Sequence, residues 1–342
     1  MATAGGLYVH SDSGAPVGRD DYTTLIIVHG YVWHAGTFAK LQLLAATYGV
    51  RIIGLNRREY PGSVPYTAEE RALLPPVPDK PLTDAEQIRS NQQILETFMR
   101  DRGYELYRSI EGLVVERNLP AISQTGGIVL VGWSLGSTWM TSLLKHVAEF
   151  PVGAVNLREY VRRVVLSDPI SCLLGYPYPA QDPWNPFFDT SLTYEERGQA
   201  FTNWITSYFA HGPTLDTFER RHALQTPPST IARQTKEDFE ATVHVPPGLP
   251  GGSDWTLVHG CVAYGIYGPL REGALFLSQD GKDTVGEEWR DVEVRFVWGD
   301  QSVWEVPYAA QLLFQEVADG ARDGKAMRKF TSLCVKGTNH FD

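Results

Sequence analysis

A serine between two glycines is the residue whose type and setting most clearly suggest chemistry. Residues 128–137 read Ile-Val-Leu-Val-Gly-Trp-Ser-Leu-Gly-Ser, so Ser134 follows an apolar, strand-like run and precedes a helical pattern. A tight turn from strand to helix lifts a serine above a sheet, and flanking glycines allow the close approach of strand and helix. Backbone N–H groups at the start of the helix can stabilise a developing anion. The pattern predicts that Ser134 is a nucleophile.

Two further turns could complete a nucleophilic mechanism. A His-Gly turn ending at Gly30 follows an early apolar run, and it can offer the Tyr31 amide to an oxyanion together with the Leu135 amide. His340 is the one histidine of nine that follows the last predicted strand. Because a general base must come from a spatially adjacent loop, we expect His340 to serve Ser134.

The carboxylate that orients this histidine has two possible positions. Asp168 stands at the carboxyl edge of a predicted strand, where sites on open α/β sheets gather. Asp300 follows a later strand, one residue after a glycine, with Glu305 further along. A carboxylate so close to that glycine would more often face loop amides than the histidine. The sequence favours Asp168 as the acid, with Asp300 as the alternative and Glu305 as a minor candidate.

These turns need a sheet to hold them, and short apolar runs supply it. Rich in Ile, Leu and Val, the runs alternate with helical patterns, which indicates a parallel sheet with crossover helices. The predicted strands span residues 24–28, 51–55, 127–131, 161–167, 293–298 and 330–335. A capping box at Thr83 and Glu86 predicts a helix before the third strand, although Gly103 and Gly112 argue against one unbroken helix.

About 120 residues between the fourth and fifth strands differ in character, being rich in proline and aromatic residues. A second capping box, Thr193 with Glu196, predicts a helix there. Phe201, Trp204 and Tyr208 fall at i, i+3 and i+7 and form an aromatic stripe, which is usually core packing and less often faces a ligand.

The contrast in composition predicts two parts. We expect a core of residues 1–168 and 287–342, with residues 169–286 inserted as a mainly helical cap.

Composition limits the partners. The chain has 342 residues, with 30 basic and 40 acidic ones, and a net charge of −10 argues against nucleic acid and anionic membranes. Three cysteines without CxxC spacing make a disulfide scaffold or zinc ribbon unlikely. No apolar run approaches the ~18 residues of a membrane helix, and no secretory signal is apparent, so we expect a cytoplasmic protein. Neither a metal nor an organic cofactor is expected, and the oligomeric state is not indicated.

Taken together, the three turns resemble those of the α/β-hydrolase superfamily in order and in position after strands. The resemblance spans residues 25–340 outside the cap, and residues 56–63 are similar to a segment of fungal members. It implies an α/β-hydrolase fold, that is, a mostly parallel sheet flanked by helices. It also implies that Ser134 is the nucleophile, His340 the base, and the Tyr31 and Leu135 amides the oxyanion hole. A serine nucleophile disfavours the epoxide-hydrolase and dehalogenase branches, which use aspartate.

The sequence departs from the family pattern in two places. The usual position of the acid, three residues past a glycine after the penultimate strand, is Ser302. The family also commonly continues with a helix after the catalytic histidine, whereas this sequence ends two residues later. We therefore expect either a trimmed chain or a core without that helix.

The activity that the resemblance implies is serine hydrolysis of an ester or lactone with a bulky apolar or aromatic body. We expect Gly30, Trp33, Trp133, Trp204 and Tyr208 to contact this small-molecule substrate. A C–C bond hydrolase, a peptidase, or an acyltransferase or cyclase would use the same triad. A hydrolase-fold binding protein without turnover is the rival from another class.

Overall fold

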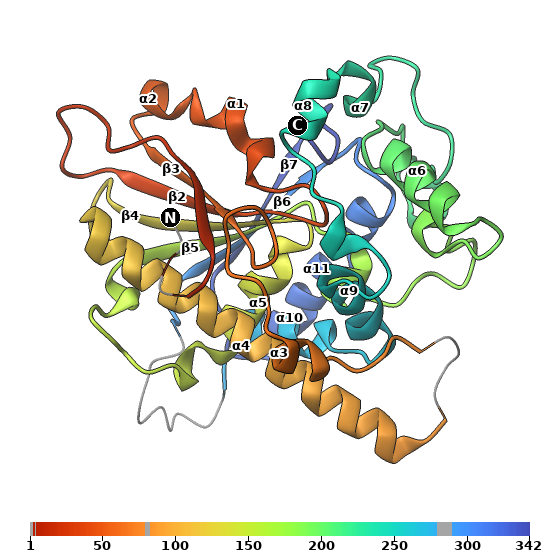
Figure 1. Ribbon diagram of the computed structural model, residues 1–342, viewed down its shortest axis with the longest axis horizontal. Helices are drawn as coiled ribbons and strands as arrows, with labels where there is room; N and C mark the ends of the chain where they lie inside the picture. Colours follow the sequence, from red (N-terminus) through yellow and green to blue (C-terminus); the bar gives the residue numbers. More distant parts are fainter. Residues whose placement is uncertain (1–2, 4, 79–82, 279–288) are drawn as a thin grey trace.

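A seven-stranded sheet organises the chain (Figure 1). The computed structural model describes residues 3, 5–78, 83–278 and 289–342. The strands run in the order β1-β3-β2-β4-β5-β6-β7, with β1 antiparallel to β3 and every other pair parallel. Their bounds are β1 (Tyr8–Asp12), β2 (Thr23–Val28), β3 (Arg51–Asn56), β4 (Gly127–Trp133), β5 (Val161–Ser167), β6 (Glu293–Gly299) and β7 (Phe330–Val335). The six predicted strands are confirmed to within two residues at each end.

The first strand was not predicted from the sequence. Tyr8–Asp12 lies at the edge of the sheet, and its register against β3 shifts between Val9 and Ser11. An edge strand with a bulge buries little apolar surface, so it lacks the continuous apolar run of the central strands.

Helices cover the two faces of the sheet unequally. Figure 1 shows one face packed against a layer of helices that includes the long α4, and the other against the short helices α1 and α2. The long layer comprises α4 (Ala85–Arg117), α5 (Gly136–His146), α10 (Tyr267–Leu275) and α11 (Glu305–Arg322). On the opposite face, α1 (Ala39–Gln42) and α2 (Ala45–Tyr48) cover a small cluster of Ile27, Ala45 and Ile52.

Helix α4 corrects two expectations. Its N-cap is Asp84, which accepts hydrogen bonds from the amides of Glu86 and Gln87, so the capping box with Thr83 does not form. The helix also continues unbroken through Gly103 and Gly112. A Cβ at Gly103 would lie 3.0 Å from the Leu143 amide nitrogen of α5. The glycine therefore permits close helix packing, which outweighs its helix propensity cost of ~1 kcal/mol.

Helices of 4 to 12 residues, with the loops between them, fill the segment between β5 and β6. The helices are α6 (Tyr194–Ile205), α7 (Thr230–Arg233), α8 (Lys236–Glu240), α9 (Ser253–Ala263) and α10, with 3-10 turns η4 (Ser171–Leu174), η5 (Pro186–Phe188), η6 (Leu215–Thr217) and η7 (Pro246–Gly248). The Thr193–Glu196 capping box opens α6 as predicted. The helix ends at Ile205, so the expectation that Tyr208 continues it is wrong.

Only part of the predicted cap lies apart from the core. Helix α10 packs on α5 in the long helical layer, whereas α6 to α9 gather beyond the carboxyl edge of the sheet (Figure 1). The predicted cap end at residue 286 falls outside the described residues, and the boundary stays a prediction. Within the described ranges, none of the helices combines the length and apolarity needed to cross a bilayer.

The remaining short elements are η1 (Ala35–Phe38), α3 (Ala68–Ala72), η2 (Val147–Glu149) and η3 (Leu157–Glu159).

Candidate active site

The turn between β4 and α5 holds Ser134 in a conformation that few serines adopt. Its φ is +53°, in the left-handed region, and its amide donates to the Ser167 carbonyl at 2.8 Å. A Cβ at Gly132 would lie 2.5 Å from the Gly136 carbonyl oxygen, and one at Gly136 only 2.4 Å from that of Val28. Both flanking glycines are therefore required by close backbone contacts, as a nucleophile turn demands.

Asp168 and His340 meet at the ends of β5 and β7. The Nδ1 of His340 lies 2.6 Å from Oδ2 of Asp168, and both side chains are buried. The same carboxylate accepts from the Ser302 hydroxyl at 2.6 Å and from the Gly299 amide at 2.8 Å. With Nδ1–H donated to the carboxylate, the Nε2 of His340 carries the lone pair that a base needs.

The two alternative acids face elsewhere. Asp300 accepts from the Gly337 amide at 2.7 Å and pairs with Lys336 at 3.2 Å. Glu305 is fully buried and accepts from the Asn185 amide group at 2.5 Å. Burial raises the pKa of Glu305 to about 7, although its hydrogen bonds oppose that shift. Ser302, at the usual position of the acid, instead supports Asp168 as a hydrogen-bond donor.

The predicted oxyanion donors lie beside the serine. Tyr31 and Leu135 line a small cavity together with Ser134. Within residues 5–78 and 83–278, neither of their backbone N–H groups has a protein acceptor. A Cβ at Gly30 would come within 2.9 Å of the Ser134 Cβ, so glycine lets this loop approach the serine. The two amides are thus free to receive an anion at this place.

A buried ion pair, which the sequence did not reveal, holds the loop. Arg57 donates to both carboxylate oxygens of Asp254 on α9, at 2.7 and 2.6 Å, and to the Gly30 carbonyl at 2.8 Å. Tyr60 donates to Asp254 at 2.5 Å, and its hydroxyl accepts from the Val32 amide at 3.0 Å. In the sequence, residues 56–63 show only a resemblance to family members and give no sign of this pairing.

His29 of the His-Gly turn also helps to hold this loop through hydrogen bonds to the backbone. His29 donates from Nδ1 to the Gly30 carbonyl at 2.9 Å and accepts from the Arg57 amide at Nε2 at 3.0 Å. Complete burial, and then the charge of Arg57, lower the pKa of His29 well below its ordinary value. Its imidazole is therefore neutral at pH 7 and positions the loop.

The structure places only one of the aromatic residues expected to contact substrate, Trp33, in an apolar groove next to the cavity at Ser134. Trp133 donates from Nε1 to the His340 carbonyl at 2.9 Å and lines, together with Asp168 and His340, a hollow separate from the cavity at Ser134. Trp204 is buried and donates to the Arg220 carbonyl, and Tyr208 donates to Asp342 at the C-terminus.

Of the aromatic stripe, only Phe201 lines the cavity at Ser134. Phe187, another of the aromatic residues between the fourth and fifth predicted strands, lines it too. Within the described ranges, no three His, Cys, Asp or Glu side chains gather in a metal-binding arrangement.

Comparison with known proteins identifies the class to which this fold and site belong. The family described as the alpha/beta hydrolase family matches residues 25–341, so the chain belongs to that family. The predicted superfamily and fold are confirmed. A search of the curated proteins finds no match.

Several solved structures are similar at low identity. An esterase from Exiguobacterium antarcticum is 14% identical over 99% of this chain and 91% of its own, with a TM-score of 0.46. A carboxylesterase from the thaumarchaeon Nitrososphaera gargenis is 12% identical over 100% and 90%, with a TM-score of 0.48. A laboratory-evolved potato epoxide hydrolase is 12% identical over 100% and 92%, with a TM-score of 0.44.

Proposed function

We propose that this chain is a serine hydrolase that cleaves an ester or lactone bond of a bulky apolar small molecule. The observation that carries the proposal is the buried Asp168–His340 pair, which follows strands of the same sheet as the strained turn of Ser134. The cavity at Ser134 is also lined by Tyr31 and Leu135, whose amides are unpaired. These are the parts that acyl transfer requires: a nucleophile, an oriented base and preorganised donors for the oxyanion.

Each step follows from these positions. Ser134 Oγ attacks the substrate carbonyl while His340 Nε2 takes its proton, and Asp168 stabilises the imidazolium that forms. The Tyr31 and Leu135 amides receive the oxyanion, and each such donor contributes roughly 10²–10³ in rate. His340 then protonates the leaving oxygen, and a water attacks the acyl-enzyme by the same route in reverse. No cofactor enters this scheme.

One hydrogen bond, between Ser134 Oγ and His340 Nε2, must form before attack. Within the described chain, no hydrogen bond joins Ser134 Oγ to His340. Catalytic hydrogen bonds of this kind are often long in the free enzyme and tighten when substrate binds.

Active-site labelling tests the proposal. The wild-type protein should react with a fluorophosphonate and hydrolyse nitrophenyl esters. Ser134→Ala should lose the label and at least ~10³ in kcat while keeping its melting temperature. Ser123→Ala, an exposed serine before the opposite end of β4, is the matched control and should behave as wild type. An Ser134→Ala protein retaining more than a tenth of the activity would rule the serine mechanism out.

A substrate screen separates the related reactions. A C–C bond hydrolase, a peptidase and an acyltransferase would all keep Ser134, so labelling alone does not distinguish them. Nitrophenyl esters and aromatic lactones should be turned over faster than peptides or vinylogous diketones if the ester proposal holds.

A further inference from the structure

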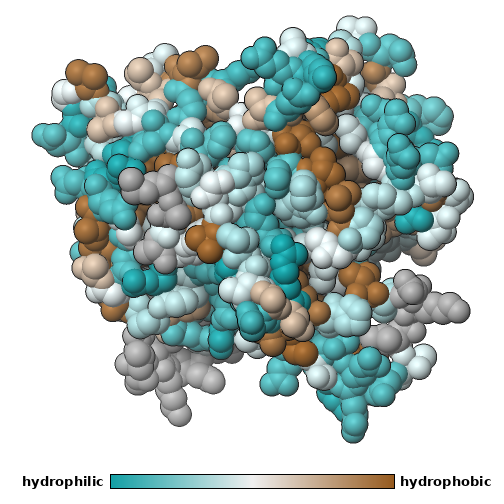
Figure 2. Space-filling model, viewed as in Figure 1, coloured by the Kyte–Doolittle hydropathy of each residue, from teal (hydrophilic) through white to brown (hydrophobic). Residues whose placement is uncertain are grey.

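Two hollows meet beside the nucleophile. The inner cavity at Ser134 has a volume of about 30 Å³. An outer groove of about 260 Å³ lies between α6 and the segment 239–249. Figure 2 shows apolar side chains gathered along this groove on the molecular surface. The inner cavity is small and the groove is large, so together they can hold a molecule with two unequal ends.

Three aromatic side chains line both hollows and stand between them: Tyr31, Phe187 and Phe201. The ring centroids of Tyr31 and Phe187 are 5.2 Å apart, those of Phe187 and Phe201 4.9 Å, and those of Tyr31 and Phe201 6.4 Å. Every ring thus contacts the other two, which is typical of aromatic clusters. We call these three side chains the aromatic gate.

The three rings are not held equally. The Tyr31 hydroxyl donates to the Gly248 carbonyl at 2.6 Å, and the Phe187 ring stacks on His259 at 5.0 Å with an interplanar angle of 10°. Phe201 has no polar anchor and is only partly buried on α6. Movement of Phe201 therefore opens the gate at the lowest cost.

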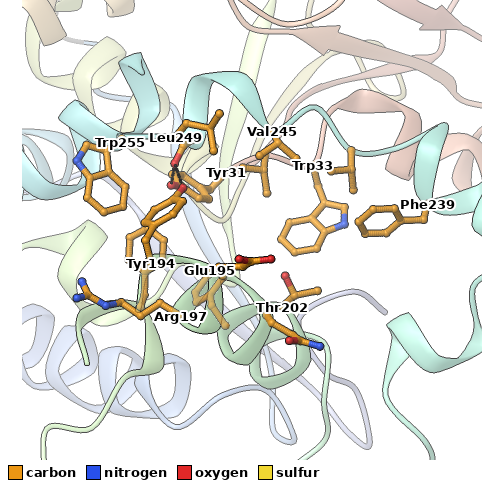
Figure 3. Close-up of a pocket in the computed structure, with 17 residues that line it drawn as sticks. Tyr31, Trp33, Tyr194, Glu195, Arg197, Thr202, Phe239, Val245, Leu249 and Trp255 are labelled. Atoms are coloured by element: carbon orange, nitrogen blue, oxygen red, sulfur yellow. Dashed lines mark hydrogen bonds between the residues drawn. The ribbon is translucent and has the colours of Figure 1, made fainter. Parts of the chain in front are cut away.

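The groove beyond the gate favours an apolar ligand. Figure 3 shows Tyr31, Trp33, Leu249 and Trp255 along one side, with Tyr194, Glu195, Arg197 and Thr202 of α6 along the other. Glu195 and Arg197 are of opposite sign, so the groove offers no net charge to a ligand. A neutral aromatic or long alkyl group fits this lining best.

We propose that the aromatic gate divides the substrate site into two subsites. The groove binds a bulky apolar group, and the inner cavity takes the small end of the molecule, no more than one or two carbons beyond the reacting carbonyl. This inference rests on the proposed ester hydrolysis and narrows its substrate class to esters with one small and one bulky apolar end.

Three esters and two variants test the division. Wild type should turn over 1-naphthyl acetate with a kcat/KM at least tenfold above 1-naphthyl hexanoate, which has the same leaving group, and ethyl acetate serves as the reference for the variants. Phe188→Ala enlarges the inner cavity alone and should raise the ratio of hexanoate to acetate at least tenfold. Phe201→Trp narrows the gate and should lower kcat/KM for 1-naphthyl acetate at least tenfold, with ethyl acetate changed less than threefold.

A matched control guards against a general effect of the larger ring. Phe314→Trp replaces a partly buried phenylalanine on α11 that lines neither hollow, and it should leave all three esters within threefold of wild type. Equal losses on ethyl and naphthyl acetate in Phe201→Trp, or an unchanged hexanoate ratio in Phe188→Ala, would overturn the two-subsite proposal.

Binding separates this inference from the proposed reaction. In Ser134→Ala, calorimetric titration with 1-ethoxynaphthalene should show binding that Leu249→Asp weakens at least tenfold, since Leu249 is a half-exposed groove residue. If Ser134→Ala binds the ether but the wild type hydrolyses none of the esters, the proposed function is wrong while the groove remains supported as an apolar binding site. Hydrolysis of esters with no binding of the ether would overturn the groove alone.

Discussion

The turns at the ends of the strands and the cap above them are built on different principles. Ser134 and Asp168 follow neighbouring strands, both with a φ of +53°, and backbone hydrogen bonds across the sheet fix their positions. The cap consists of short helices and loops that meet through aromatic rings, such as Trp184 against Trp204 at 6.1 Å. Backbone bonds of the sheet thus position the candidate catalytic residues, while side-chain packing of the segment between β5 and β6 shapes the cavity at Ser134.

The largest expected effect concerns the acid at the strand end. Asp168→Asn should lower kcat by roughly 10⁴, because the imidazole loses the partner that holds its tautomer and orientation. Asp300→Asn should stay near wild type, since its carboxylate faces Gly337 and Lys336. Steady-state kinetics of both variants make the comparison. A dead Asp300→Asn beside an active Asp168→Asn would place the acid after β6 instead.

The ion pair between core and cap comes next. Asp254→Asn leaves Arg57 buried with its charge uncompensated, and breaking such a pair costs about 3–5 kcal/mol of unfolding free energy. Asp182→Asn is the matched control, because Asp182 binds Arg221 through the same two-pronged contact at an exposed site, where pairs contribute about 0–1 kcal/mol. Denaturant unfolding should show a larger loss of unfolding free energy for Asp254→Asn than for Asp182→Asn. Similar losses in the two variants would mean that the Arg57 pair does not stabilise the fold.

Trp204 tests whether the cap has a core of its own. Its side chain is 5% exposed and lines neither hollow at the site. Trp204→Ala should therefore cost about 3–5 kcal/mol of stability while changing the ratio of kcat/KM values between naphthyl and ethyl acetate little. A large change in that ratio with unaltered stability would instead assign Trp204 to the substrate, as the minority interpretation of the stripe proposed.

The smallest expected effect depends on pH. Glu305 of α11 binds the cap residue Asn185, and burial raises its pKa from 4.5 to about 7. A raised carboxyl pKa means that the folded state keeps a proton that the unfolded state has lost. The resulting stability is full below pH 4.5 and disappears as the pH rises to about 7, on the order of 2–3 kcal/mol between pH 5 and 8.

Glu305→Gln has no proton to lose, so its unfolding free energy should lack this slope. Chemical denaturation of both proteins at pH 5, 6, 7 and 8 measures the difference. Parallel curves for wild type and variant would show that Glu305 is already ionised at pH 5.

The features best predicted from the sequence are those that depend on residues close together in the chain. The strands were recognisable as apolar runs, and the residues that follow them as glycine-flanked or polar turns. Asp168 was favoured for its place at a strand end, and the structure sets its carboxylate 2.6 Å from His340, although its role in catalysis stays a prediction. Register in a parallel sheet brings such turns together, so their proximity follows from the strands themselves.

Long-range packing was beyond the sequence. Arg57 and Asp254 are 197 residues apart, and no local pattern pairs them. The unbroken α4 depends on the fit of Gly103 against α5, and the direction of each ring in the stripe depends on which neighbours surround it. Trp204 points inward and donates to the Arg220 carbonyl, and Tyr208 donates to Asp342. Phe201 instead lines the cavity at Ser134.

The Arg57–Asp254 pair also determines which side of the cap can act as a hinge. Opening the site by lifting α9 would separate two charges in a medium of low polarizability, and it would drag the Gly30 carbonyl with them. Among the described residues, helix α6 forms no ion pair of this kind: Phe201 packs on the Tyr31 ring at 6.4 Å, and Tyr194 donates to the Gly248 carbonyl of η7 at 3.3 Å. If the site opens, we therefore expect α6 to separate from the loop of Gly30 more easily than α9 does.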